Sequence, residues 1–166
     1  MSILPILQYP DPRLREKCVP AKDISDRIRK ILNDMAETMY DAPGIGLAAS
    51  QVGVPERLVV IDLGEDDESG RVSRLYKLVN PEIVRSEGTT EYEEGCLSIP
   101  SIRETVKRSA FVEVHALDEN GKTLELEAEG LLAICLQHEI DHLDGILFID
   151  HLSRIKRELI KRKLRK

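Results

Sequence analysis

The sequence predicts a single α+β domain in which antiparallel strands pack around one buried helix. The chain has 166 residues, of which 42% are hydrophobic, enough for one core but not comfortably for two. Strand-like segments precede a strongly apolar, helix-length segment near the C-terminal end, and strand and helix do not alternate as in parallel βαβ units. We therefore expect antiparallel strands around that helix, with an amphipathic helix near the N-terminus and another helix at the C-terminus.

The first expected element is an amphipathic helix over residues 23–40. Apolar residues recur there at spacings of three and four, which is the pattern of one buried helix face. Asp23 or Ser25 is placed to cap its start, and the sequence DAPG at residues 41–44 ends it. A stretch rich in small residues, GIGLAASQVGVP, follows at residues 44–55.

Two strands are expected next. Residues 57–63, RLVVIDL, are rich in β-branched side chains and predict a buried strand. The acidic residues 64–71 predict a solvated loop. A further strand is expected at residues 75–79, ended by Asn80 and Pro81.

A hairpin and a buried helix complete the expected body of the domain. Residues 110–130 alternate in polarity on either side of Asn120 and Gly121, which is a strong hairpin signal. Residues 131–143 then predict a helix that is apolar nearly all round. Such a helix belongs in the core of a protein.

The C-terminal segment differs in charge from the rest of the chain. After residue 150 there are eight basic residues and one acidic residue, so this tail carries +7 while residues 1–150 carry −13. One face of its predicted helix carries Leu152, Ile155, Leu159, Ile160 and Leu164. Two interpretations are open: a docked terminal helix with a solvated basic face, or a surface for acidic partners such as RNA.

Several protein classes are excluded by composition. The N-terminal residues contain no apolar stretch of signal-peptide length, and no run approaches the length of a membrane span. The three cysteines, Cys18, Cys96 and Cys135, are odd in number and widely spaced, unlike a disulfide framework. We expect a soluble, cytoplasmic protein with reduced thiols and no membrane partner.

The apolar helix contains the pattern H-E-x-x-H. His138 and His142 are four residues apart, so both imidazoles lie on one helix face and can reach one ion, with Glu139 to the side. Buried and unpaired, each of these polar groups would cost on the order of 1–3 kcal/mol. A bound ion would remove that cost, which favours a metal site over two inert core histidines.

A catalytic metal site of this kind needs a third protein ligand. The longer pattern H-E-x-x-H-x-x-G-x-x-H would supply a third histidine. This chain does not match it, because Phe148 stands at the last position. Glu158 and His151 are the downstream candidates. Cys96 is the better candidate, because it lies in extended or turn-forming sequence, EEGCLSIP, where a thiolate can point at the helix. Cys135 competes with it, but its apolar neighbours favour a core position.

Three stretches together resemble the signature motifs of peptide deformylases, the enzymes that remove the formyl group from the N-terminal methionine of new bacterial proteins. They are GIGLAASQ at residues 44–51, EGCLSIP at residues 94–100 and QHEIDHLDG at residues 137–145. The resemblance covers nearly the whole chain. It implies a catalytic domain over residues 1–150, to which residues 151–166 add a basic helix.

The resemblance also implies a metal site and catalytic roles. One divalent ion per chain would be held by Cys96, His138 and His142, with Fe2+ the usual metal in cells and Zn2+, Ni2+ or Co2+ able to occupy the site. Thiolate and imidazole ligands suit several of these ions. Glu139 would transfer protons, and the main-chain N–H of Leu97 and the amide of Gln51 would stabilise the oxyanion.

Formyl-methionyl nascent peptides are the implied substrates. The glycines of the first motif permit a peptide to lie alongside as an added strand, and the methionine side chain would enter an apolar pocket. The residues expected to contact substrate are Gly44, Ile45, Gly46, Tyr92, Gly95, Arg103, Leu131, Ile134 and Cys135. A pair of Glu94 with Arg108 is expected to hold the cysteine loop. In some family members a C-terminal helix docks at the ribosome, and the basic tail would suit rRNA.

Two other functions remain open at this point. A metallopeptidase would use the same helix with Glu158 or His151 as third ligand. A non-enzymatic protein would use a closed metal site to stabilise its fold, which requires four protein ligands. Only three convincing ligands are found in the sequence.

Overall fold

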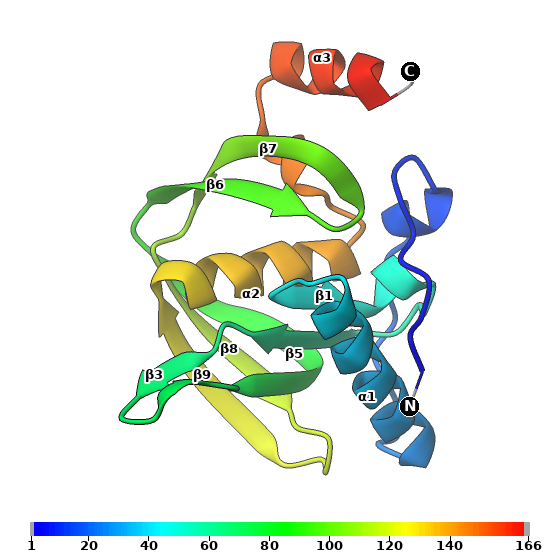
Figure 1. The fold of residues 1–166 in the computed structure, drawn as a ribbon, viewed down its shortest axis with the longest axis vertical. Coiled ribbons are helices and arrows are strands. Elements are labelled where there is room, and N and C mark those ends of the chain that lie inside the picture. The colour runs from blue at the N-terminus through cyan, green and yellow to red at the C-terminus, as the bar shows by residue number, and fades with distance from the viewer. Residues whose placement is uncertain (1, 165–166) are drawn as a thin grey trace.

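The structure, a computed structural model, describes residues 2–164. Its largest element is an antiparallel sheet with strand order β1-β2-β5-β8-β9. These strands are β1 (Gly46–Ala48), β2 (Leu58–Asp62), β5 (Leu75–Glu87), β8 (Phe111–Leu117) and β9 (Thr123–Glu129). Figure 1 shows α2 (Gly130–Leu143) between this sheet and a two-stranded sheet of β6 (Thr90–Cys96) and β7 (Ile99–Arg108). The expected α+β fold around a buried helix is confirmed.

The burial of α2 follows from its composition. Ten of its 14 residues are buried, and Leu136 and Leu143 pack with Val59 and Val114 of the sheet in one apolar cluster. Because this helix also carries the H-E-x-x-H pattern, the motif side chains are held inside the molecule rather than on its surface.

Helix α1 (Asp26–Asp41) packs against β1 and β2 through a second apolar cluster. Ile28 and Met39 are among its fully buried side chains, as the three-and-four spacing predicts. Ser25 occupies the N-cap position, although its side chain makes no capping hydrogen bond. The predicted helix and its end at the DAPG sequence are confirmed to within a few residues.

Strand β5 runs further than the sequence indicates. It continues to Glu87, through Asn80 and Pro81, which were expected to end a strand over residues 75–79. Asn80 adopts a φ of 54°, and the pairing with β8 shifts register here, so the proline is not required to donate a ladder hydrogen bond. The Asn80 side chain also bonds to the main chain of Ala21. The predicted strand end is therefore wrong, because a bulge lets the strand continue.

The predicted hairpin is formed by β8 and β9. Its loop at residues 118–122 contains Asn120 and Gly121, as expected. The Asp118 carboxylate closes the loop by accepting from the main-chain N–H groups of Asn120 and Lys122. Gly121 has a φ of 85°, a left-handed conformation that favours glycine.

Other strands were not expected from the sequence. Within residues 64–71, Glu65–Asp67 and Gly70–Val72 pair as β3 and β4, so the prediction of a loop there is wrong in part. β1 and the hairpin of β6 and β7 also lack a clear signal. In that hairpin Glu94 and Arg108 occupy buried positions, so the apolar alternation that marks a strand is interrupted.

The C-terminal helix α3 (Arg154–Leu164) docks through only part of its apolar surface. Ile160 is 4% exposed and Leu164 packs against the same cluster, whereas Ile155 and Leu159 are 75% and 52% exposed. Ile155 and Leu159 are therefore left out of the docked surface, which buries only part of the apolar face seen in the sequence. These two form a row four residues apart, beside the row that docks.

Three short 3-10 helices complete the fold: η1 (Pro12–Arg15), η2 (Ala49–Val52) and η3 (Phe148–His151). Arg165 and Lys166 of the basic tail lie outside the described residues. Within residues 2–164, the helices lack the combination of length and apolar character that a membrane span requires.

The end of β2 is fixed by a carboxylate that is 8% exposed. Asp62 accepts hydrogen bonds from the hydroxyl groups of Tyr40 and Ser73 and from the main-chain N–H groups of Gly64 and Arg74. Burial alone would raise the pKa of Asp62, but these hydrogen bonds outweigh it and lower the pKa to about 2. The main-chain N–H of Asp62 also donates to the loop that precedes β1.

We predict that Asp62→Asn destabilises the protein at pH 7 by about 2 kcal/mol. Because the pKa of Asp62 is lower in the folded than in the unfolded state, its stabilisation is complete above about pH 5 and is lost as the pH falls from about 4 to about 2. Urea unfolding of parent, Asp62→Asn and the exposed control Asp41→Asn, at neutral and acid pH, measures this. A difference between parent and Asp62→Asn that stays constant with pH contradicts the assignment.

Candidate metal centre

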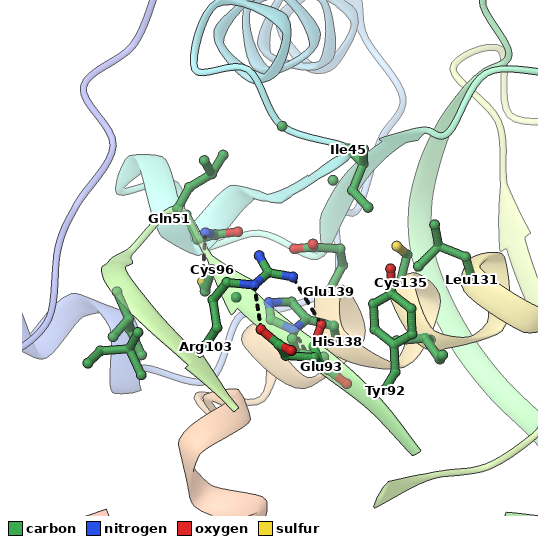
Figure 2. A pocket seen from close by; sticks show the side chains of 18 of the residues that line it. Ile45, Gln51, Tyr92, Glu93, Cys96, Arg103, Leu131, Cys135, His138 and Glu139 are labelled. Carbon is green, nitrogen blue, oxygen red and sulfur yellow. Dashed lines mark hydrogen bonds and ion pairs between the residues drawn. The ribbon is translucent and has the colours of Figure 1, made fainter. Parts of the chain in front are cut away.

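A cavity of about 430 Å³ opens between α2, the loop before β1 and strand β6. In Figure 2, Cys96 and Gln51 lie at one end of it and Tyr92, Leu131 and Cys135 at the other. Its lining includes all nine residues expected to contact substrate, namely Gly44, Ile45, Gly46, Tyr92, Gly95, Arg103, Leu131, Ile134 and Cys135. It also includes Gln51, Cys96, Leu97, His138 and Glu139, whereas His142 is fully buried.

Three candidate metal ligands converge beside this cavity. The ligand atoms of Cys96, His138 and His142 all lie within 4.8 Å of one another. The Nε2 atoms of the two histidines are 3.2 Å apart, and Cys96 Sγ is 3.3 Å from His142 Nε2. At most one proton can lie between the two atoms of each contact. The remaining lone pairs of the sulfur and of the two Nε2 atoms therefore point into the same small volume. This donor set fits a divalent ion with thiolate and imidazole ligands.

The orientation of His138 is set by a buried carboxylate. His138 Nδ1 lies 2.9 Å from Glu94 Oε1, so Nδ1 carries the proton and the lone pair of Nε2 is available on the other side. Glu94 forms a bidentate pair with Arg108, both contacts 2.8 Å long, as expected from the sequence. Burial alone would raise the pKa of Glu94, but Arg108 and His138 lower it to about 2. Glu94 is therefore a permanent anion behind His138.

The electrostatics of the two histidines favour a cation between them and the thiol. Burial opposes a charge on His138, but its contacts with Cys96 and Glu94 outweigh burial and raise its pKa well above the usual value. Burial, followed by the neighbouring His138, lowers the pKa of His142. The site thus favours a positive charge at His138 beside Cys96, where a metal ion can replace the proton on Nε2. His142 stays neutral, as a metal ligand must be.

Glu139 is buried beside the same volume and has an unpartnered oxygen. It is 5% exposed, and within the described residues its Oε1 atom has no hydrogen-bond partner. Burial raises the pKa of Glu139 to about 7, and the charge of His138 opposes that rise only in part. A Cβ atom on Gly46 would lie 2.6 Å from Glu139 Oε2, so the glycine makes room for this carboxylate.

Gln51 is held in one orientation by three contacts. Its Oε1 atom accepts from the main-chain N–H of Ala48 at 2.9 Å, while Nε2 donates to Ser98 Oγ at 3.1 Å and lies 3.6 Å from Cys96 Sγ. The amide N–H groups of Gln51 therefore face the cysteine. Ser98, which is fully buried, is not predicted from the sequence, because a serine in a turn-forming stretch gives no distinctive signal.

The other end of the cavity is apolar. Leu131, Ile134 and Cys135 project into it from α2, with Tyr92 opposite. Cys135 is 6% exposed and packs in the core cluster as predicted, yet it also lines the cavity. Burial raises the pKa of the Cys135 thiol above its usual range, so it is an apolar wall rather than a ligand.

A charged pair lies on the strands that flank the cavity mouth. Arg103 Nε is 3.1 Å from a Glu93 carboxylate oxygen, and Arg103 Nη2 donates to the Glu93 main-chain carbonyl at 3.2 Å. Both side chains are more than 60% exposed. This pair places opposite charges in the lining of the cavity.

Neither of the alternative third ligands joins this group. Glu158 is exposed on α3, and the Nε2 atom of His151 contacts Asp141 and Arg108. Within residues 2–164, Cys96, His138 and His142 form the group of side chains that could hold a metal ion. A peptidase site with Glu158 or His151 as third ligand therefore has no support in the geometry.

Comparison with known proteins places this geometry in a family. Residues 3–158 match the family described as polypeptide deformylase. A peptide deformylase from Alkalilimnicola ehrlichii is 56% identical over all of this chain and 91% of its own length, and one from Neisseria meningitidis is 54% identical over all of this chain and 96% of its own. The crystal structure of a peptide deformylase from Legionella pneumophila has 50% identity and a TM-score of 0.89 over 98% of this chain and 94% of that one. The crystal structure of a peptide deformylase from Ehrlichia chaffeensis in complex with actinonin has 40% identity and a TM-score of 0.92. It covers 99% of this chain and 96% of that one. The chain therefore belongs to the peptide deformylase family.

Proposed function

We propose that this protein hydrolyses the N-formyl group of peptides that begin with formyl-methionine, releasing formate and a free amine. The observation that carries the proposal is the convergence of Cys96, His138 and His142 beside the unpartnered carboxylate oxygen of Glu139. These groups lie next to a cavity with one polar and one apolar end. We place the reaction in the cytoplasm, where nascent chains leave the ribosome.

Peptide deformylases are metal-dependent, and we assign Cys96, His138 and His142 as the ligands of one divalent ion. When bound, such an ion acts as a Lewis acid and lowers the pKa of water. We propose Fe2+ as the ion in the cell, on the family resemblance. The ligand set also suits Zn2+, Ni2+ and Co2+, so metal analysis of protein purified without oxygen is the direct test.

Glu139 is proposed to move the protons of the reaction. A carboxylate with a pKa near 7 can accept a proton from the attacking water and then deliver it to the leaving amide nitrogen. Both transfers use the oxygen that has no partner in the structure. The C–N bond breaks as the nitrogen gains that proton, leaving formate and the free amine.

Gln51 and Leu97 are proposed to stabilise the oxyanion that forms when water adds to the formyl carbon. The Gln51 amide already points at Cys96 and carries two hydrogens, so it can turn one of them from Ser98 towards the oxyanion. The main-chain N–H of Leu97 follows the cysteine directly in the chain. Such donors act because they are in place before charge develops.

The peptide is proposed to bind as an extended strand. β1 is the edge strand of its sheet and, among the described strands, β6 pairs with β7 alone, so two strand edges flank the cavity. Gly44, Ile45 and Gly46 line one wall and Gly95 the other. Main-chain hydrogen bonds along such edges do not depend on the side chains of the peptide, which suits an enzyme that acts on many nascent chains.

Side-chain recognition is proposed to be confined to the methionine and the residues just after it. The methionine side chain would occupy the apolar end of the cavity, formed by Tyr92, Leu131, Ile134 and Cys135. Arg103, on β7 beside the cavity mouth, would meet the residues that follow. Formyl peptides with a polar first side chain should therefore bind weakly, because that end offers few hydrogen-bond partners.

We also propose that α3 contacts ribosomal RNA. Arg154, Arg162 and Lys163 are exposed on it, and Ile155 and Leu159 leave an apolar row beside them. Basic residues bind a phosphate backbone with an affinity that falls as salt rises. Deletion of α3 would also remove the buried Ile160, so charge reversal is the cleaner test.

We predict that Glu139→Gln lowers formate release from formyl-Met-Ala-Ser by about 10²–10⁴, because the amide cannot accept a proton. Metal content should stay near one ion per chain. Glu158→Gln, an exposed glutamate on α3, is the matched control and should leave both activity and metal unchanged. Loss of metal in Glu158→Gln would revive the peptidase arrangement, and a metal-loaded parent without activity would refute deformylation.

For the oxyanion, Gln51→Leu should lower kcat by about 10²–10³ with metal retained, because one donor is removed. Gln8→Leu removes an exposed amide and serves as the control. The measurement is kcat and KM for the same formyl peptide in both variants. An unchanged kcat in Gln51→Leu would show that the amide only supports Ala48 and Ser98.

For the ribosome, the double variant Arg162→Glu and Lys163→Glu should weaken binding to purified ribosomes at least tenfold at low salt, and the salt dependence should become shallower. Lys17→Glu with Lys22→Glu makes the same change in net charge on exposed residues of the body. Activity on a short formyl peptide should be equal in both. Equal ribosome binding by the two double variants would remove the proposal.

A further inference from the structure

A chain of polar contacts leads from the proposed metal site to a second cleft, lined by Arg108, Asp141 and His151. Arg108 is 3% exposed at its side chain and holds Glu94 through Nε and Nη2. Its remaining nitrogen, Nη1, lies 2.6 Å from Asp141 Oδ2 and 3.2 Å from His151 Nε2. His151 Nε2 is itself 2.8 Å from Asp141 Oδ2. Asp141 and His151 therefore close the chain that begins at His138.

These contacts fix the plane of a buried guanidinium at both ends. An arginine side chain is planar, with its donors in fixed directions. Held by Glu94 on one edge and Asp141 on the other, Arg108 cannot rotate or slide without losing a charged partner. Because Glu94 binds Arg108 with both oxygens, its plane is fixed as well, and the His138 ring bound to it is aligned in turn.

The balance of charge points the same way. Arg108 carries one positive charge and faces two carboxylates, Glu94 and Asp141. Because Asp141 shares the cation, Glu94 is neutralised less completely and keeps more negative charge towards the Nδ1–H of His138. A carboxylate at that position raises the basicity of the imidazole as a ligand.

We propose that Asp141 and His151 are positioning residues of the metal centre, which act on His138 through Arg108 and Glu94. The inference rests on the proposed metal ligands, and it assigns a role to two residues that touch neither the ion nor the substrate. Asp141 supplies the charge that anchors Arg108, and His151 holds the Asp141 carboxylate in place. Their absence leaves the site assembled but less well aligned.

The position of His151 makes the proposal testable without disturbing the core. Its side chain is 35% exposed and lines a surface cleft of about 330 Å³ together with Asp141 and Arg108. Substitution of His151 therefore leaves the apolar clusters intact. His151→Gln keeps a side-chain N–H for Asp141, whereas His151→Leu removes it.

The test follows metal release from Co2+-loaded protein. Asp141→Asn should lose Co2+ to excess chelator about three- to tenfold faster than the parent, and its visible Co2+ absorption spectrum should shift, because outer partners of a ligating histidine tune the ligand. His151→Leu should show a smaller change of about two- to fivefold, and His151→Gln should behave like the parent. KM for formyl-Met-Ala-Ser should not change, because Asp141 and His151 are not among the residues that line the cavity.

Asp144→Asn is the matched control. Asp144 follows the same helix and pairs with Arg57 at 2.9 Å instead of Arg108, so its substitution removes an equal charge at a similar place. Parent-like Co2+ release and spectrum in Asp141→Asn would overturn the proposal. So would equal effects of Asp144→Asn and Asp141→Asn, or equal behaviour of His151→Gln and His151→Leu. If Asp141→Asn fails to fold, the His151 pair decides alone.

Failure of the proposed function would look different. A Co2+-loaded parent that releases no formate would refute deformylation. The rates of Co2+ release and the spectra of the variants would still test the roles of Asp141 and His151. A parent that binds no Co2+ would refute both the proposed metal ligands and the proposed roles of Asp141 and His151. Faster release with an unchanged unfolding midpoint separates positioning of the metal from a general loss of stability.

Discussion

Burial of two histidines and a glutamate on one apolar helix is the constraint on which this structure depends. α2 is buried because its remaining surface is apolar, and it carries His138, Glu139 and His142 into the interior with it. Each of these groups loses hydration that it must recover from a partner. The Glu94–Arg108 pair on β6 and β7 provides that partner for His138. The sheet of β6 and β7 is therefore required by the buried polar groups of α2.

The same constraint shapes the opposite wall of the site. Gly46 leaves the space that the Glu139 carboxylate occupies, and a Cβ at Gly44 would lie 2.8 Å from the side chain of Leu97. η2 then carries Gln51 over the cysteine, locked by Ala48 and by Ser98. β1 is short and lies at the edge of its sheet. One stretch of sequence thus provides both the space for the Glu139 carboxylate and a strand edge beside the cavity.

What the sequence predicts depends on how local each signal is. α1, α2 and the β8–β9 hairpin are predictable because apolar spacing and a turn sequence act within one segment. The β6–β7 hairpin is not, because Glu94 and Arg108 break its alternation and find their partners in each other, on α2 and at His151. The proposed metal ligands can be recognised in the sequence from their residue types and spacing. The contact of Asp141 with Arg108 cannot, since an acid three residues after His138 has no partner until the fold supplies Arg108.

The pKa values of Glu94 and Glu139, the two buried carboxylates near His138, differ because their partners differ. Both are buried, and burial by itself raises the pKa of each. Glu94 has Arg108 against both of its oxygens, which lowers its pKa to about 2, so it stays charged and orients the imidazole. Glu139 has one oxygen without a partner, and its pKa rises to about 7, so it can exchange protons near neutral pH. Two identical side chains are thereby separated into a charged anchor and a carboxylate that can exchange protons. Exchange of these roles would require moving an arginine, which the Arg108 contacts to β6 and α2 prevent.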